Sequence, residues 1–274
     1  MEKKLKISSY ENIWNLSQVK LFQETHSSYL YKALYKDSNK TILKLFKSDS
    51  DEINFPNSLQ FFNQPKVAKI IKFSEEAALL EEIIPGDSLA AAKQKNYLDA
   101  AEIFCNLCKD LHLKDLNLNN YRSVKDLEKD FDLFLKKPDK PISSDMINKA
   151  KNLFIHLVQT QKNLKLLHGD LHHYNILKNK DGWVAIDPKG IVGELEYEVG
   201  AFLRNPIDTS NHFLDKRIFI QRVNYICSHL QLNSQRVMRW CFVQLVLAIS
   251  YKIQNKEILR DWITLLEFTH SEIK

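Results

Sequence analysis

Short runs of alternating apolar and polar residues occupy the first 85 positions of the chain. Residues 28–35 and 41–46 are two such runs, and the turn-forming sequence KDSN between them predicts a β-hairpin. Residues 67–73 and 77–84 predict two more strands. We therefore expect residues 1–85 to form a small β-rich lobe.

Apolar residues recur at helical spacing after Pro85-Gly86. The segments that carry this spacing are 97–113, 123–137, 143–165, 215–231, 234–254 and 256–270. Between them, residues 166–192 form short strand-like runs separated by polar positions. The pattern predicts an α+β protein of two lobes in which residues 86–274 form the larger, mainly helical lobe. A cleft between two lobes is the usual place for a ligand.

Composition places the chain among globular proteins with a large core. It has 274 residues, of which 44% are hydrophobic and 27% are charged. The longest uncharged apolar run, 240–251, is much shorter than the roughly 20 residues that span a bilayer, so it predicts a buried helix and no membrane association. The opening sequence MEKKLKISSY lacks the apolar core of a signal peptide. We therefore expect a cytoplasmic protein whose mature chain starts at Met1.

The charges and the cysteines exclude two further classes. The net charge of +5 comes from 39 basic and 34 acidic residues that are spread along the chain, which gives no support for nucleic-acid binding. Cys105 and Cys108 form a lone C-x-x-C, and Cys108 shares helical spacing with Phe104 and Leu111. We therefore expect these thiols to be reduced and packed in the core, not to bind metal or carry redox chemistry.

Glycine is rare in this chain and unevenly placed. Five of the six glycines lie between positions 169 and 200, and neither the GxGxxG nor the GxxxxGK[ST] spacing occurs. A chain that uses so little glycine needs unusual backbone geometry where it does use it. The search for chemistry therefore begins at 169–200.

The segment HGDLHHYN at 168–175 contains a set of residues suited to phosphoryl transfer. Asp170 is followed five positions later by Asn175, and Asp187 follows the strand-like sequence WVAI. One carboxylate can accept the proton of an acceptor hydroxyl, while an amide oxygen and a second carboxylate can hold Mg²⁺ against phosphates. We assign Asp170 as the catalytic base, and Asn175 and Asp187 as metal ligands. The competing interpretation is that these aspartates only cap a turn and end a strand.

The sequence HGDLHHYNIL, followed by AIDPKGIVGELEYEVGAFLRNP, resembles the aminoglycoside phosphotransferase superfamily. Within it, the similarity is greatest to the branch of streptomycin and hydroxyurea resistance kinases, and the specific match covers 166–206. The resemblance implies a protein-kinase-like fold, with a nucleotide-binding lobe at 1–85 and with the catalytic loop and acceptor pocket at 86–274. It implies an enzyme that uses ATP and Mg²⁺ to phosphorylate a small-molecule hydroxyl, and it leaves GTP open as the donor.

The same resemblance implies nucleotide-binding residues in the small lobe. LLEEIIPGDSL resembles the family hinge, where the carbonyl of Glu82 and the amide of Ile84 would bind adenine. In TILKLF, Lys44 would contact the α- and β-phosphates. Its acidic partner is not clear from the sequence, because Phe55 aligns with that position and Glu52 is the nearby acid.

Two departures from protein kinases also follow from this comparison. Gly169 stands where protein kinases carry an arginine, and Pro188-Lys189 follow the metal aspartate, so we expect a constitutively competent kinase of the small-molecule branch. The turn that covers the phosphates contains no glycine. Its phosphate contacts would come from Thr25, Ser27 and Ser28.

The acceptor pocket is less well defined by the sequence. Either His172 or His173 would face the cleft. Glu198 would hydrogen-bond the catalytic loop or lie at a helix start, and Arg204 would contact substrate or serve the structure. A cationic acceptor such as streptomycin needs carboxylates around its amines and guanidines. The acids beyond the active loop that are candidates for this role, or for solvated helix charges, are Asp208, Asp261 and Glu267.

Three alternatives stay open at this point. The acceptor could be a metabolite such as a choline-like amine, an amino alcohol or a sugar. The chain could be a pseudokinase that only binds ligands, because the acidic partner of the lysine is missing. The pattern H-x-D-x-H-H also resembles a dinuclear metallohydrolase site, for which His212 and His229 are the available extra ligands. We expect a monomer or weak dimer in each case.

Overall fold

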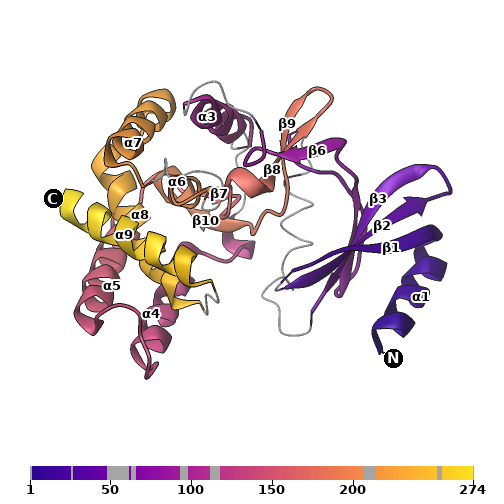
Figure 1. The fold of residues 1–274 in the computed structure, drawn as a ribbon, viewed down its shortest axis with the longest axis horizontal. Coiled ribbons are helices and arrows are strands. Elements are labelled where there is room, and N and C mark those ends of the chain that lie inside the picture. Colours follow the sequence, from indigo (N-terminus) through magenta and orange to yellow (C-terminus); the bar gives the residue numbers. More distant parts are fainter. Residues whose placement is uncertain are drawn as a thin grey trace. The chain divides into compact units, whose positions relative to one another are not determined.

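The computed structural model describes residues 2–25, 27–47, 62, 66–92, 98–111, 118–206, 214–251 and 255–273. The chain divides into two compact units (Figure 1). The first unit comprises 1–87 together with 177–189, and the second comprises 88–176 and 190–274. The first unit therefore contains a short segment from the second half of the chain, which the apolar pattern alone did not place there.

A five-stranded antiparallel sheet forms the centre of the first unit, with the strand order β1-β2-β3-β5-β4 (Figure 1). Its strands are β1 (Leu16–Glu24), β2 (Ser28–Tyr35), β3 (Asn39–Phe46), β4 (Ile70–Phe73) and β5 (Ala77–Glu81). The predicted hairpin is confirmed, since β2 and β3 pair from Ser28 opposite Phe46 to Tyr35 opposite Asn39.

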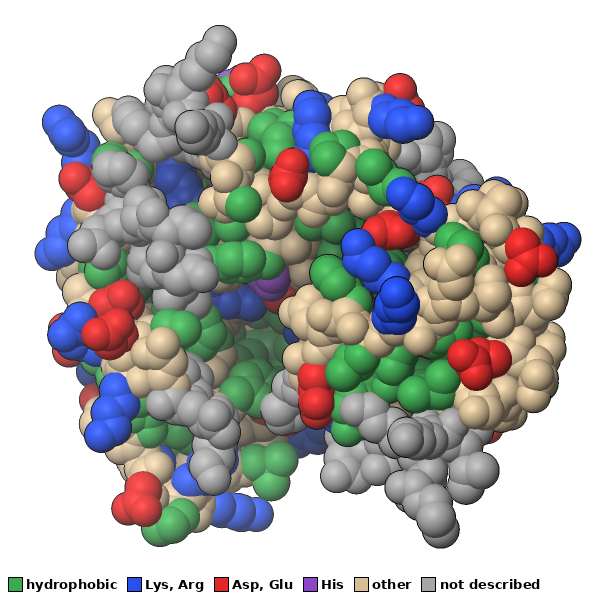
Figure 2. Space-filling model, turned by 45° about the vertical axis from the view of Figure 1, so that its right-hand side comes forward, with side chains coloured by type: hydrophobic (Ala, Val, Ile, Leu, Met, Phe, Trp, Pro, Cys, Tyr) green, Lys and Arg blue, Asp and Glu red, His purple; other side chains and the backbone are tan. Residues whose placement is uncertain are grey.

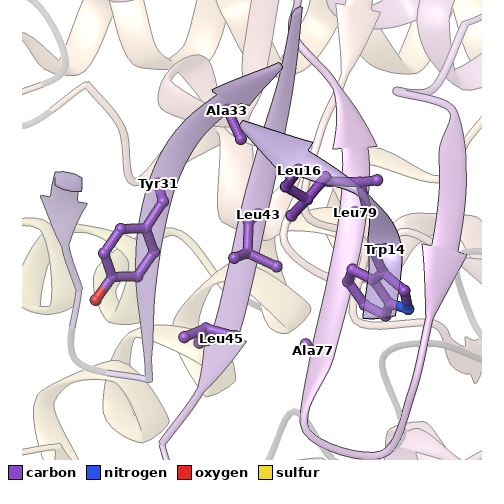
Figure 3. Packing of buried hydrophobic residues seen from close by; sticks show 8 residues of the cluster. All are labelled: Trp14, Leu16, Tyr31, Ala33, Leu43, Leu45, Ala77 and Leu79. Carbon is purple, nitrogen blue, oxygen red and sulfur yellow. The ribbon is translucent and has the colours of Figure 1, made fainter. Parts of the chain in front are cut away.

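Helix α1 (Glu2–Trp14) packs against one face of this sheet and was not expected from the sequence. Figure 3 shows a buried core that includes Leu43, Leu79 and Trp14 of this helix. Ile7 and Tyr10 pack against the same core, so Ile7, Tyr10 and Trp14 all face the sheet. These three residues are spaced three and four apart, which is the spacing of one helix face. The polar residues between them hide this short stripe in the sequence.

The segment 177–189 is attached to the first unit by strand pairing. Strands β6 (Pro85–Ser88), β8 (Ile176–Asn179) and β9 (Gly182–Ala185) form a second sheet in the order β6-β8-β9. The amide of Ala185 donates to the Lys66 carbonyl at 2.8 Å, and the amide of Ala68 donates to the Ala185 carbonyl at 2.9 Å. These bonds place Asp187, two residues after β9, in the same unit as Lys44.

The second unit is mainly helical, and each of the six predicted helical segments contains a helix. The helices are α3 (Asp99–Leu111), α4 (Glu128–Leu135), α5 (Ser144–Gln159), α6 (Leu195–Leu203), α7 (Lys216–Leu230), α8 (Ser234–Ser250) and α9 (Lys256–Glu272). Side chains of Ser143, Asp215, Asn233 and Asn255 accept backbone N–H bonds and cap α5, α7, α8 and α9. Helix α8 contains residues 240–250 of the predicted buried run and packs against α5, α6 and α9, whereas Tyr251 lies beyond the helix and is exposed.

The four cysteines lie in the core of this unit as free thiols. Burial raises the pKa of Cys105, Cys227 and Cys241 to about 12, so these thiols are protonated at neutral pH. The expectation of core packing is confirmed. Basic and acidic side chains are interspersed on the face that Figure 2 shows. None of the described helices combines the length and apolar character needed to cross a membrane.

Candidate active site

The loop that carries Asp170 is held between two short strands of the second unit. Strand β7 (Lys165–Leu167) precedes the loop and pairs with β10 (Ile191–Gly193). His168 is fully buried, its carbonyl accepts from the Gly190 amide at 3.3 Å, and its Nδ1 accepts from the Asp170 amide at 3.3 Å. The backbone on both sides of the carboxylate is therefore fixed by hydrogen bonds.

Gly169 explains why the loop needs a glycine at this point. Its φ of +81° lies in the left-handed region, which side chains other than glycine rarely adopt. Its amide donates to Glu198 Oε1 at 3.0 Å, and Glu198 is 1% exposed on α6. Glu198 thus binds the loop backbone, which is one of the two roles that the sequence left open.

Two cationic or polar side chains approach the carboxylate of Asp170. Arg204 Nη2 lies 3.4 Å from Asp170 Oδ1, and His172 Nε2 lies 3.8 Å from the same oxygen. The side chains of Asp170 and Arg204 are 19% and 14% exposed. The carboxylate is therefore accessible to a small molecule while one of its oxygens is held by an arginine.

Asn175 lies at the end of the short 3₁₀ turn η4 (His173–Asn175). Its Nδ2 donates to the Asp170 carbonyl at 3.0 Å, and its amide N–H donates to the His172 carbonyl at 2.9 Å. Its Nδ2 is thus used within the loop, and its other polar side-chain atom is the amide oxygen Oδ1, the expected metal ligand. The sequence could predict this pair because both residues belong to one contiguous motif.

In the first unit, Lys44 and Asp187 form an ion pair between Nζ and Oδ1. Lys44 is buried in the sheet, whereas Asp187 is more exposed. Asp187 has a φ of +63°, an uncommon conformation for a non-glycine residue and one found more often at functional sites. The candidate partner Glu52, like Phe55, lies outside the described residues.

The donor set of Asn175 and Asp187 fits Mg²⁺ chemically. One amide oxygen and one carboxylate are hard oxygen ligands, and Mg²⁺ is usually held by one or two carboxylates together with substrate phosphates. Across the described ranges, no group of three or more His, Cys, Asp and Glu residues could hold a metal by itself. Each of these two residues therefore carries an oxygen donor of the kind that Mg²⁺ accepts.

The turn between β1 and β2 is closed by its own hydroxyl groups. The Thr25 amide donates to the Ser28 carbonyl at 2.9 Å, the Ser28 amide donates to Thr25 Oγ1 at 3.0 Å, and the two hydroxyls lie 3.0 Å apart. Lys47 Nζ binds the Thr25 carbonyl at 2.7 Å, and the Lys47 amide donates to the Ser27 carbonyl at 2.8 Å. The hydroxyls of Thr25 and Ser28 thus shape the turn that was expected to cover phosphates.

The expected hinge residues follow strand β5 and lie outside it. Glu82 is held to the sheet by its amide, which donates to the Lys40 carbonyl at 3.2 Å, and by its carboxylate, which binds Lys32 Nζ at 2.7 Å. Ile84 is exposed, and among the residues described its amide has no hydrogen-bond partner. Among the described residues, the Ile84 amide, one of the two backbone groups expected to bind adenine, is therefore unpaired.

The candidate acceptor-binding acids are not equivalent. Asp261 and Glu267 both lie on α9, but they are six positions apart and so point to different sides of the helix. Asp261 is mostly buried and its Oδ1 lies 3.8 Å from Arg260 Nε, whereas Glu267 is exposed. Trp262, next to Asp261, donates from Nε1 to the Arg204 carbonyl at 3.4 Å, which places this part of α9 beside the end of α6. Asp208 lies outside the described residues.

The structure adds Gln244, which the sequence did not single out. Gln244 lies in α8, and its Oε1 accepts from Arg204 Nη1 at 2.7 Å. The signal was present, because Gln244 interrupts the apolar run 240–251 and a buried amide needs hydrogen-bond partners.

The alternative metal site is not assembled in the part of the chain that the structure describes. His229 lies in the last turn of α7, where its ring stacks on Tyr225 with centroids 3.9 Å apart. The ring of the buried His173 stacks on Phe202. His212 lies outside the described residues. The histidines that the structure describes therefore do not form a dinuclear cluster with Asp170.

Comparison with known proteins gives an independent line of evidence. Residues 13–254 match the family described as "Aminoglycoside/hydroxyurea antibiotic resistance kinase". A streptomycin 3''-kinase of Klebsiella pneumoniae is 36% identical over 80 residues, which cover 27% of this chain and 29% of that kinase. The resemblance inferred from residues 166–206 is thereby confirmed.

Solved structures show the same fold at low sequence identity. Choline kinase LicA from Streptococcus pneumoniae superposes with a TM-score of 0.70 at 13% identity, covering 98% of this chain and 99% of that one. The aminoglycoside phosphotransferase APH(4)-Ia, in a ternary complex with ADP and hygromycin B, has a TM-score of 0.68 at 10% identity, covering 96% and 97%. The predicted α+β, kinase-like fold is confirmed. This chain belongs to the aminoglycoside/hydroxyurea antibiotic resistance kinase family.

Proposed function

We propose that this chain transfers the γ-phosphoryl group of ATP to a hydroxyl group of a cationic small molecule, with an aminoglycoside such as streptomycin as the first candidate. The observation that carries the proposal is the geometry of the Asp170 loop. Its carboxylate is partly accessible, while the adjacent backbone is held by Glu198 and Asn175. A carboxylate held in this way can serve as a positioned proton acceptor.

In the proposed reaction, Asp170 accepts the proton of the acceptor hydroxyl. The hydroxyl oxygen forms a bond to the γ-phosphorus as the bond from that phosphorus to the bridging oxygen breaks, and ADP leaves with the electron pair. Lys44 would position the phosphates with its buried ammonium group. Mg²⁺ would be held by Asn175 and Asp187, where it neutralises phosphate charge.

The adenine contacts in this proposal are backbone groups. The Ile84 amide would donate to the ring and the Glu82 carbonyl would accept from it. The exposed position of Ile84 and the unpaired state of its amide among the described residues support this assignment. The tightly closed turn at Thr25 and Ser28 would cover the phosphates.

Two observations favour an aminoglycoside acceptor. The family match covers most of the chain, and a streptomycin 3''-kinase is the partial relative. Asp261 is a mostly buried carboxylate beside Trp262, which binds the backbone of Arg204. A carboxylate in such a place can pair with an ammonium or guanidinium group of the acceptor.

A choline-like amine is the second candidate acceptor. It is favoured by the choline kinase with a TM-score of 0.70. Both acceptor classes carry a positive charge and a hydroxyl, so the Asp170 chemistry is the same. They differ in size and in the number of charged groups, so measuring turnover of each class separates the two candidates.

The test is ADP formation by the purified chain with ATP and Mg²⁺, in the presence of streptomycin, hygromycin B, choline or ethanolamine. We expect turnover with an aminoglycoside, and we expect Asp170→Asn to lower it about 10²- to 10⁴-fold while nucleotide binding is retained. Asp181→Asn in the exposed turn before β9 is the matched control, with activity unchanged. Turnover with choline alone would favour the second candidate. Nucleotide binding without turnover would favour a pseudokinase.

A further inference from the structure

We propose that Arg204 is a positioning residue that holds the carboxylate of Asp170 toward the acceptor hydroxyl, and that Gln244 and Gly200 hold Arg204 in place. This inference rests on the proposed kinase function and deepens it. The sequence suggested either substrate contact or a structural role for Arg204. The contacts of its guanidinium group indicate a third role, which is to orient the carboxylate of Asp170.

The guanidinium group of Arg204 joins two acceptors. Nη2 lies 3.4 Å from Asp170 Oδ1, and Nη1 donates to Gln244 Oε1 at 2.7 Å. A guanidinium is a planar fork of donors that stays charged, so binding at Nη1 also restricts where Nη2 points. The shorter contact with Gln244 therefore aims the other nitrogen at the carboxylate.

Gln244 is itself held in one orientation. Its Nε2 donates to the Tyr197 carbonyl at 2.5 Å, and the residue is 6% exposed. Since a carbonyl only accepts, the amide nitrogen of Gln244 must face Tyr197 and the amide oxygen must face Arg204. The orientation of this amide is thus determined by α6.

Gly200 makes room for the Gln244 side chain against α6. A Cβ at position 200 would lie 2.7 Å from Gln244 Cδ and Oε1, and 2.9 Å from Nε2. Such distances are too short for any side chain, so the amide of Gln244 would have to move. The glycine at 200 is therefore needed for close packing of α6 and α8.

The backbone that carries Arg204 is anchored on both sides. Arg222 Nη2 donates to the carbonyls of Phe202 and Asn205 at 3.0 and 3.1 Å, and Trp262 Nε1 donates to the Arg204 carbonyl at 3.4 Å. These donors bind carbonyls at the end of α6 and just beyond it, where the regular helical hydrogen-bond pattern stops. Arg204 thus projects from a rigid support.

Protein kinases carry an arginine immediately before the catalytic aspartate, and this chain has Gly169 at that position. Gly169 occupies the position before Asp170, and its amide binds Glu198. In this chain an arginine nevertheless reaches the catalytic carboxylate, from the end of α6 and 34 positions away in the sequence. Because Gln244 holds the guanidinium group of Arg204, and Arg222 and Trp262 bind the backbone around it, no phosphorylated activation loop is needed to place this arginine.

The kinetic test compares Arg204→Met, Arg204→Lys and Gly200→Ala with the unaltered chain. We expect Arg204→Met to lower kcat about 10- to 100-fold while the KM for ATP and the KM for the acceptor change less than about twofold. Arg204→Lys keeps the charge but cannot bridge both acceptors, so its loss should be smaller but measurable. Arg217→Met, at an exposed arginine of α7, is the control and should keep full kcat.

Gly200→Ala tests whether Gln244 holds Arg204 in place, because it changes neither Asp170 nor Arg204. We expect a lower melting temperature and a lower kcat. In the double variant Gly200→Ala with Gln244→Ala, the clash is removed but so is the contact with Arg204. Its melting temperature should recover in part while kcat stays low. Recovery of kcat would contradict the proposal that Gln244 holds Arg204 in place.

A thermal unfolding cycle tests the contact without using activity. The change in melting temperature caused by Asp170→Asn is measured twice, once in the unaltered chain and once in Arg204→Met. The two changes should differ by about 2 °C or more if the two side chains interact. Equal shifts would overturn the contact. If no acceptor is turned over, the proposed function fails, whereas this cycle still decides whether Arg204 holds Asp170. Two outcomes would overturn the positioning role even if the cycle shows that Arg204 and Asp170 are coupled. One is an unchanged kcat in Arg204→Met, and the other is a rise in the acceptor KM of that variant with no change in kcat.

Discussion

The polar groups of the β1-β2 turn and those of the catalytic loop are held in opposite ways. In the turn, Thr25 and Ser28 bind each other across three positions of the chain. In the loop, Gly169 binds Glu198 from 29 positions away, and Asp170 meets Arg204 from 34 positions away. The first unit therefore shapes its candidate phosphate cover with bonds inside the turn and from Lys47 at the end of β3, whereas the second unit shapes its candidate base through helices more distant in the sequence.

The largest expected contrast is between Asp170→Asn and Lys44→Met. Loss of the base should lower kcat about 10²- to 10⁴-fold with nucleotide affinity retained. Loss of the buried Lys44 removes a charge-assisted contact of about 1.5–3 kcal/mol, so nucleotide affinity should fall about 10- to 150-fold. Titration with a fluorescent ATP analogue and steady-state kinetics measure both. Unaltered nucleotide affinity in Lys44→Met would contradict the assignment of this lysine.

A second contrast concerns buried and exposed ion pairs. Glu194 is 2% exposed and accepts from Arg236 Nε and Trp240 Nε1 in the second unit, whereas Glu24 pairs with Lys47 on the surface of the first unit. Glu194→Leu removes the shared acceptor of the partly exposed Arg236 and the buried Trp240 Nε1, and it should cost about 3 kcal/mol of unfolding free energy. Glu24→Ala should cost at most about 1 kcal/mol. Urea unfolding followed by tryptophan fluorescence gives both values, and equal costs would remove the contrast.

His173 should make the second unit sensitive to acid. Burial, followed by the nearby charges of Arg222 and His172, holds the pKa of His173 well below its usual value of 6.5. Below pH 6.5 the unfolded chain binds a proton at this histidine that the folded chain does not, so stability falls as the pH is lowered. The expected loss is about 1.4 kcal/mol per pH unit.

Urea unfolding between pH 7 and pH 5 tests this slope, with His173→Phe as the comparison. Phenylalanine keeps an aromatic ring against Phe202, whose centroid lies 4.2 Å from that of His173. In the variant, the decrease of the unfolding free energy with falling pH should be smaller by the contribution of about one bound proton, which is about 1.4 kcal/mol per pH unit. An unchanged slope in the variant would show that another group is responsible.

The smallest expected effect belongs to the turn. Thr25→Val removes the hydroxyl that accepts from the Ser28 amide, and it should cost about 1 kcal/mol of stability. Ser38→Ala, in the exposed turn between β2 and β3, is the control. The KM for ATP should rise less than about tenfold, because the loss acts through the shape of the turn. A larger rise with unchanged stability would instead indicate that the Thr25 hydroxyl binds phosphate directly.

Local patterns were sufficient for the secondary structure they describe. The hairpin at 28–46 and the buried helix α8 follow from alternation and helical spacing, which depend only on near neighbours in the chain. Helix α1 was missed because its apolar stripe is short and its burial depends on the sheet it meets. For the candidate site, a contiguous motif was enough to bring Asp170 and Asn175 together.

Other parts of the site required the folded chain. Lys44 and Asp187 are 143 positions apart, and the segment that carries Asp187 joins the first unit by pairing with residues 66–68. The family resemblance offered Glu52 as the acid near the position that pairs with Lys44, and Glu52 lies outside the described residues, so that assignment stays a prediction. Strand pairing across long separations is not encoded in any single window.

By itself, the sequence determined the family, the kinase-like fold class, the helical and sheet regions, and the motif that contains the proposed base and metal ligands. These properties reside in contiguous residues and in local periodicity. Only the tertiary structure decided that Arg204, Gln244 and Gly200 act together on Asp170, because Gln244 lies 40 positions from Arg204 and on another helix. A hydrogen bond between distant residues exists only when packing brings donor and acceptor within about 3 Å.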